Sequence, residues 1–267
     1  MHELLLFGQI PSSRHDQVLN ILASVAAMQP VPILEKHLVF KPNKIPGSAG
    51  PAQAVNGQDA QKRALQAQTQ GELFYMQLVA DVSERPAEAS QGDADVDMDQ
   101  HEQDIPGTAS TDATLGDNST LPERWTLQFR DIPEVSRQRP VTSRLMSDVP
   151  ITSGDPMKFM SALDYSHTSS YLLKGHRFTH LSTNILLYRL LVPPTRSSQA
   201  PPLEISRPQL LDPSGTYMLQ AVVRVQDGSK VETMTKGMNE LLSLKETLKG
   251  VVEMEMGDRL ALDTRVR

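Results

Sequence analysis

Residues 217–226 read YMLQAVVRVQ, residues 227–250 read DGSKVETMTKGMNELLSLKETLKG, and residues 251–256 read VVEMEM. The first segment is rich in apolar and β-branched residues, which predicts a strand that Asp227-Gly228 ends. The third segment alternates apolar with acidic residues, as a half-buried strand does. Together the segments predict a β–α–β unit, with a short turn leading into one more strand over residues 260–266.

The middle segment has the features of a capped amphipathic helix. Apolar residues recur at helical spacing and define one stripe: Val231, Met234, Met238, Leu241 and Leu248. Ser229 and Glu232 have the spacing of a capping box, in which each side chain accepts a hydrogen bond from a backbone N–H of the first turn. Gly250 is placed to end the helix. The unit is well specified, yet it contains no reactive group.

The rest of the chain predicts mainly strands. The segment His2–Ile10 is apolar on both faces, which indicates a strand inside a sheet. A helix follows, with a weaker cap of the form Ser13-x-x-Asp16. Further strands are predicted over residues 33–41, 72–82, 125–130, 141–148, 171–181 and 185–192. The last two form a hairpin around residues 182–184, and a short turn or helix is predicted near 157–163.

Ten predicted strands and two long helices indicate a mainly β protein with flanking helices, of the α+β class. Few helices separate the strands, so a doubly wound parallel sheet is excluded. An open sheet of this size would leave long exposed edges, which favours a closed antiparallel β-barrel. We expect one domain over residues 1–267, with disordered inserts at 43–70 and 83–119 and a long loop at 193–213.

Composition narrows the function classes. The net charge of −6 comes from the second insert, which has ten acidic residues and one basic residue, Arg85. The remaining chain is nearly neutral and has no basic cluster with stacking aromatics, so we expect no sequence-specific nucleic-acid binding. The chain has no cysteine, which excludes disulfides and thiol catalysis. The apolar run at the N-terminus is too short for a signal or membrane segment, and we expect a soluble intracellular protein.

No residue is predicted to be catalytic, cofactor-binding or metal-binding. Phosphate-binding, dinucleotide-binding and hydrolase motifs are missing from the sequence. His176 and His180 lie four residues apart on one strand face, but with only His167 as a third candidate they are interpreted as ordinary polar residues. Glu253-x-Glu255 has the alternation by which tunnel-shaped triphosphatases hold metal ions. A single such pair is weak evidence, so this enzyme class is kept only as the alternative.

Five blocks of sequence resemble the Mediator complex subunit 18 family, in particular its fungal members. They are MHELLLFGQIP (1–11), the strand with Trp125, the hairpin DYSHTSSYLLKGHRFTHLSTNILLYRLL (164–191), and the C-terminal blocks GTYMLQAVVRV (215–225) and MNELLSLKETLKGVVEMEM (238–256). The blocks occur in the family's order. They are patterns of aromatic, glycine and apolar positions, with no catalytic signature among them.

The resemblance implies a function that the residues alone do not give. Members of this family are nuclear, non-catalytic subunits of the Mediator head module, a coactivator that links gene-specific regulators to RNA polymerase II initiation. Their β-barrel is related to that of the tunnel triphosphatases. The resemblance implies a heterodimer with Mediator subunit 20, tethering by a C-terminal helical segment of subunit 8, and no cofactor.

Overall fold

The computed structural model describes residues 1–43, 73–83, 124–135, 139–193 and 208–266. Apart from Asn43 and Ser83, the two predicted inserts lie outside the described residues. Their predicted disorder, like the assignment of the whole chain to one domain, stays a prediction.

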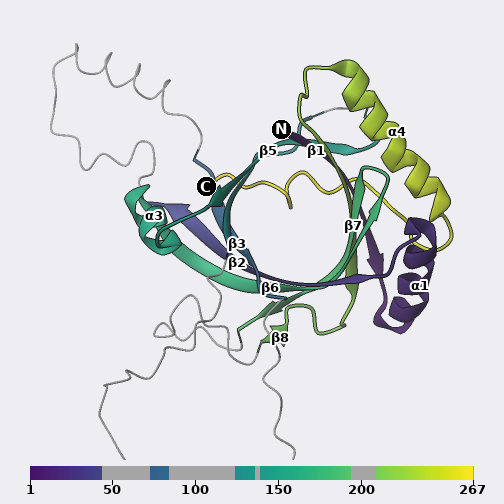
Figure 1. Ribbon diagram of the computed structural model, residues 1–267, viewed down its shortest axis with the longest axis horizontal. Helices are drawn as coiled ribbons and strands as arrows, with labels where there is room; N and C mark the ends of the chain where they lie inside the picture. Colours follow the sequence, from purple (N-terminus) through teal and green to yellow (C-terminus); the bar gives the residue numbers. More distant parts are fainter. Residues whose placement is uncertain (44–72, 84–123, 136–138, 194–207, 267) are drawn as a thin grey trace, which may run out of the picture.

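Nine strands in the described residues form one antiparallel sheet, which closes into a barrel (Figure 1). The strands are β1 (His2–Ile10), β2 (Val31–Pro42), β3 (Met76–Asp81), β4 (Trp125–Arg130), β5 (Thr142–Ile151), β6 (Tyr165–His180), β7 (Thr183–Val192), β8 (Gln209–Leu210) and β9 (Tyr217–Val225). Their order is β6-β2-β3-β4-β5-β1-β9-β7-β8, and a further pairing of β6 with β7 closes the first eight into a ring. The predicted fold class is confirmed.

Each strand of the barrel has an outer and an inner face, because successive side chains alternate across a sheet. On β1, Leu4 and Leu6 are fully buried in an apolar cluster beneath two helices. Leu5 on the opposite face is also fully buried, while Glu3 on that inner face is charged. β1 lies between β5 and β9, as expected for a strand that is apolar on both faces.

Three helices pack on the outside of the barrel (Figure 1). α1 (His15–Ala26) contacts β6, and α4 (Val231–Thr247) contacts β1 and β9. The short helix α3 (Pro156–Ala162) packs over a second apolar cluster that contains Phe40, Leu78 and Trp125. No helix in the described part of the chain is long and apolar enough to cross a membrane.

The predicted apolar stripe of α4 is largely correct. Met234, Leu241 and Leu248 are buried in the outer cluster, and Met238 packs against it. Val231, however, the first residue of the helix, is 77% exposed. The buried face also contains two residues that the predicted stripe did not include: Leu244, and Gly237, which lies close to the barrel.

Both predicted helix caps are wrong. The N-cap of α4 is Lys230, and no side chain caps it, because the Ser229 hydroxyl donates to the Asp227 carboxylate in the preceding turn. The first long helix begins at His15 after a 3-10 turn, and no Ser13 side-chain cap forms. A side-chain cap occurs instead on α3, where Asp155 accepts from the backbone N–H groups of Met157 and Lys158.

The two strands predicted after α4 do not form, so the β–α–β unit is wrong. Residues 251–256 keep the alternating burial, with Val252 and Met254 buried, but they make only one isolated bridge, between Glu255 and Phe7 of β1. Residues 260–266 contain turns and a single bridge from Arg265 to Phe74. This C-terminal segment crosses one end of the barrel, from β1 to the start of β3 (Figure 1).

The hairpin of β6 and β7 is confirmed, with two changes. Its turn is one residue earlier than predicted, because His180 already pairs with Thr183 and Leu181 has a left-handed φ of 54°. β6 also begins at Tyr165, because its first half pairs with β2 alone. The predicted long loop at 193–213 contains the short strand β8, which pairs with the end of β7.

Candidate functional site

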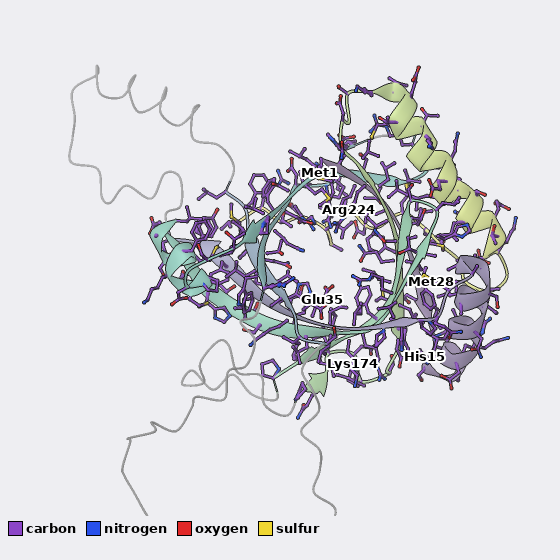
Figure 2. All side chains as sticks on the ribbon, viewed as in Figure 1. Met1, His15, Met28, Glu35, Lys174 and Arg224 are labelled. Atoms are coloured by element: carbon purple, nitrogen blue, oxygen red, sulfur yellow. The ribbon has the colours of Figure 1, made fainter. Side chains whose placement is uncertain are left out.

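The inner surface of the barrel carries charged and polar side chains, of which Glu3 and His37 are buried. Strand register places these side chains on one face. Glu3 of β1 lies opposite Arg144 of β5 and Arg224 of β9, and residues directly opposite in a sheet share a face. Figure 2 shows Glu35 and Arg224 on the inner side of the ring. We call this inner surface the lumen.

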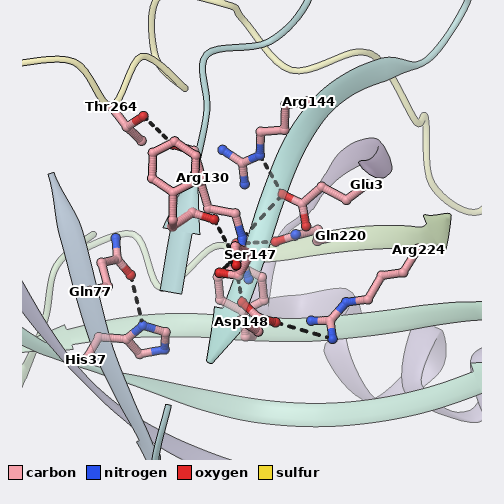
Figure 3. A network of polar contacts seen from close by, with 12 residues as sticks. Glu3, His37, Gln77, Arg130, Arg144, Ser147, Asp148, Gln220, Arg224 and Thr264 are labelled. Carbon is pink, nitrogen blue, oxygen red and sulfur yellow. Dashed lines mark hydrogen bonds and ion pairs between the residues drawn. The ribbon is translucent and has the colours of Figure 1, made fainter. Parts of the chain in front are cut away.

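An ion-pair network joins four neighbouring strands, β4, β5, β1 and β9, along the lumen wall (Figure 3). Glu3 accepts a hydrogen bond from Nε of Arg144, and its Oε1 lies 3.5 Å from Nε of Arg130. Arg130 also donates from Nη1 to Asp148 at 2.6 Å. Arg224 reaches the second carboxylate oxygen of Asp148 at 3.5 Å. The Glu3 side chain is only 4% exposed, so its charge depends on these partners.

A second polar group covers the wall formed by β2, β3 and β6. His37 lies between two partners: Nδ1 is 3.3 Å from Oε1 of Gln77, and Nε2 is 3.2 Å from Oε2 of Glu35. The ring stacks on Tyr171 at 4.6 Å, and the Tyr171 hydroxyl donates to the same Gln77 oxygen. Hydrogen bonds therefore satisfy the buried polar atoms of His37 on both sides.

Two lumen tyrosines are strongly affected by this environment. Burial raises the pKa of Tyr171 to about 12, assisted by Tyr188 and Glu35 and opposed by the Gln77 hydrogen bond. Burial likewise raises the pKa of Tyr188 to about 12, opposed by the positive charge of Arg144. Both hydroxyls therefore stay neutral near pH 7 and act as hydrogen-bond donors rather than as bases.

The charged side chains of the lumen are paired as in a structural network rather than as in a catalytic centre. Its carboxylates Glu3 and Asp148 are each held by arginines, which stabilise the ionised form but occupy the lone pairs that a metal ion would need. Among the described residues no three His, Asp or Glu side chains gather to hold a metal ion. The arrangement can hold the strands in register and fix their charges.

The residues behind the triphosphatase alternative lie elsewhere. Glu253 and Glu255 are both exposed, in the segment that crosses the barrel end. Lys249 pairs with Glu246 on the surface, and Arg259 donates to the backbone carbonyl of Pro133. The alternation of Glu253 and Glu255 therefore does not place two carboxylates in the lumen. The lumen does contain carboxylates, so the case against a triphosphatase depends on how these carboxylates are paired.

The histidine pair is also separated from any shared site. His176 and His180 do lie on one strand, β6, but the ring next to His176 is that of His15 from α1, with centroids 5.9 Å apart. His167 instead contacts the hydroxyl of Ser170 at 2.8 Å. The three histidines of the sequence-based set therefore do not meet.

Sequence reasoning assigned no role to Glu3 and missed its arginine partners and Asp148. A usable signal existed, because these charged residues interrupt otherwise strand-like segments at alternate positions, as in Arg144-x-Met146-x-Asp148. What the sequence does not provide is strand order. Arg144 and Arg224 become neighbours of Glu3 only because β1 lies between β5 and β9.

Comparison with known proteins gives consistent matches along the whole chain. A family model described as Med18 protein matches residues 2–265. A protein of Aspergillus fumigatus called Mediator of RNA polymerase II transcription subunit 18 is 39% identical over 275 aligned residues, with both chains fully covered. The proteins of that name from Coccidioides immitis and Yarrowia lipolytica are 35% and 24% identical, again over the full length of both chains.

A solved structure supports the same fold. A chain in the structure of the Schizosaccharomyces pombe Mediator head module aligns with a TM-score of 0.63 at 19% identity, covering 96% of this chain and 99% of that one. At this identity the likeness shows the fold. The sequence matches carry the assignment further, since they include nearly every residue of the barrel and its helices: the chain belongs to the Med18 protein family.

Proposed function

We propose that the chain is a non-catalytic structural subunit of the Mediator head module, which links gene-specific regulators to RNA polymerase II initiation by protein–protein association. The observation that carries this proposal is the family match over residues 2–265, together with full-length relatives named as Mediator subunit 18. A nuclear location follows from this role.

The partners we propose are Mediator subunit 20, as a heterodimer, and a C-terminal helical segment of subunit 8. Both follow from the family assignment, as do wider contacts with the head module and the polymerase machinery. We propose no sequence-specific nucleic-acid binding and no membrane contact. The proposed binding of protein partners is supported by an exposed surface on the outer wall of the barrel.

That surface is the outer face of β4 and β5, which we call the β4–β5 face. Leu145 and Val149 of β5 point to this face and are 41% and 49% exposed. Val149 lies opposite Leu127 of β4, and the two are followed along the wall by Phe129. Among the described helices, α1 and α4 pack on β1, β6 and β9, and α3 packs on β6 and over the Trp125 end of β4, which leaves Leu145 and Val149 exposed. An exposed apolar wall of this kind is typical of a protein-binding surface.

The β4–β5 face is a sheet surface, which favours a broad partner over a single helix. A sheet face buries large flat areas, whereas a helix is held best in a groove. We therefore assign the face to subunit 20, the barrel-shaped partner, rather than to the helical segment of subunit 8.

Absence of catalysis is part of the proposal. The lumen carboxylates Glu3 and Asp148 are held by Arg130, Arg144 and Arg224, and Glu35 pairs with His37. The buried tyrosines are too weakly acidic to act as bases near neutral pH. The alternative, a metal-dependent triphosphatase, requires carboxylates from several strands that are open to a metal ion.

Co-expression with subunit 20 and the C-terminal segment of subunit 8, followed by gel filtration, tests the assignment. A stable 1:1:1 complex is the expected result, and a monomer that binds neither partner would contradict it. Triphosphate hydrolysis with Mg²⁺ or Mn²⁺ by the purified chain would instead support the alternative.

A pair of variants tests the assigned surface. Val149→Asp puts a charge on the β4–β5 face and should abolish binding of subunit 20 while leaving the melting temperature within a few degrees of wild type. Leu211→Asp is the matched control, because Leu211 is 55% exposed and follows β8, away from this face. Equal loss of binding in both variants would show that the effect is not specific to the β4–β5 face.

A further inference from the structure

Two histidines from distant parts of the chain meet on the outer wall of the barrel. His15 is the first residue of α1, and His176 lies on the outward face of β6, next to the fully buried core residue Phe178 two positions along. Their ring centroids are 5.9 Å apart, with the ring planes inclined by 40°. The site lies where the start of α1 reaches the barrel (Figure 2, near the label of His15).

Each ring has one buried nitrogen that lacks a partner among the described residues: Nε2 of His15 and Nδ1 of His176. Unsatisfied polar atoms are rare in protein interiors because each costs free energy of desolvation. Here two of them occur on neighbouring rings. Such a pair points to a species that the two nitrogens share.

The surroundings hold both rings ready to act as ligands. Nδ1 of His15 lies 2.8 Å from Oδ1 of Asp16, a contact that places the proton on Nδ1 and leaves a lone pair on Nε2. The His15 ring also stacks on Tyr217 at 4.2 Å, which fixes its orientation. Burial, and secondarily the nearby His15, lowers the pKa of His176.

We propose that His15 and His176 together bind one divalent transition-metal ion, of the zinc or copper class, through these two nitrogens. Neutral imidazole nitrogen is a preferred ligand of these ions, and a carboxylate bonded to the second ring nitrogen is their usual support. Two imidazoles on one tetrahedral zinc ion, with Zn–N bonds of about 2.0–2.1 Å, have centroids about 5 Å apart, slightly closer than the 5.9 Å between these two rings.

The site has two protein ligands, since no third ligand-type side chain of the described residues joins the group. Water completes the coordination. The charges nearby partly offset one another: Asp16 is bonded to His15, and the Arg189 guanidinium lies 4.6 Å from the centre of the Tyr217 ring. The ion would tie the start of α1 to β6, and the inference does not depend on the proposed role in Mediator.

Metal binding by the full chain tests the inference directly. After chelator treatment, the protein is dialysed against Zn²⁺ and, separately, Cu²⁺, and bound metal is measured by mass spectrometry. We expect one ion per chain and at least a tenfold weaker affinity in His15→Ala and in His176→Ala. His180→Ala is the matched control, because His180 shares the strand and face of His176 but lies four residues further on, and it should bind as wild type.

Two further measurements keep the test decisive. Circular dichroism checks that each variant folds, and His176→Gln replaces His176→Ala if the latter does not. Asp16→Asn should weaken Zn²⁺ binding by about tenfold through the ring orientation of His15. The inference is overturned if the wild type binds no stoichiometric ion, or if loss of His180 reduces binding as much as loss of His15. The first result would leave a bridging water as the partner of both nitrogens.

Discussion

The inner and outer walls of this barrel are stabilised by different forces. Beneath α1 and α4 the outer wall is a continuous apolar cluster that includes Leu4, Leu219 and Leu241, all fully buried or nearly so. The lumen is held by ion pairs and hydrogen bonds around Arg130 and His37. One strand, β1, contributes to both walls through alternate residues. The comparison shows that a single sheet can separate an interior governed by packing from one governed by charge.

The largest expected effect comes from placing a charge in the outer wall. Leu241→Asp should lower the free energy of unfolding by more than about 4 kcal/mol, because it removes a fully buried side chain and buries an unpaired carboxylate. Val231→Asp is the control on the same helix, and its 77% exposure predicts a change within about 0.5 kcal/mol. Urea denaturation measures both, and equal losses would contradict the described face of α4.

Breaking the charge network of the lumen should cost slightly less. Arg130→Met leaves Glu3 and Asp148 without their shared partner, and loss of one member of a buried ion pair costs about 3 kcal/mol. Arg224→Met should cost much less, because Arg224 is 46% exposed and has one long contact with Asp148. If Arg224→Met loses more free energy of unfolding than Arg130→Met in the same denaturation experiment, Arg224 rather than Arg130 contributes more to the stability of the network.

Alkaline pH should weaken the lumen and leave the outer wall unchanged. The pKa values of Tyr171 and Tyr188 are about 12 in the folded protein and about 10 in an unfolded chain, so the unfolded state loses its protons first. Stability therefore falls as pH rises from 10 to 12, by an amount on the order of 2 kcal/mol per tyrosine. The double variant Tyr171→Phe and Tyr188→Phe should lose this dependence, which thermal melting at several pH values would measure. An unchanged slope would mean that other groups carry it.

The smallest effects concern the helix ends, which belong to neither wall. Asp155→Ala should cost about 1 kcal/mol, because the Asp155 side chain accepts from two backbone N–H groups at the start of α3. Ser229→Ala should cost only a few tenths, because Ser229 hydrogen-bonds Asp227 and caps nothing. Denaturation of both variants compares them, and a greater cost for Ser229→Ala would restore the predicted capping box.

The outer wall was predictable from the sequence and the lumen largely was not. Helical spacing from Met234 to Leu248 identified the buried stripe of α4, because such spacing reports one local periodicity. Apolar residues on both faces of β1 identified a central strand for the same reason. The lumen network depends on which strands are neighbours, and Glu3 meets Arg144 and Arg224 only through contacts between segments far apart in the chain.

The errors at the C-terminus have a related cause. Alternation over Val251–Met256 reports which side chains face the protein, and Val252 and Met254 are indeed buried. It does not report whether a neighbouring strand has a free edge to pair with. Here β9 pairs along all of β1 and β5 pairs with residues 2–5, and beyond them the segment makes a single bridge, from Glu255 to Phe7. The segment therefore lies across the barrel end without becoming a strand.

The position of β1 also sets the order in which the barrel can fold. The ribosome synthesises residues 2–10 well before their pairing partners, residues 142–145 and 217–225. Until the second partner emerges, one edge of an apolar strand stays unpaired, and an unpaired apolar edge invites aggregation. Ring closure is thus a late event with high contact order, which makes folding slow. A messenger RNA truncated before β9 would yield a chain that cannot close the barrel. Such a chain would expose an open sheet to the chaperones and proteases of the cell.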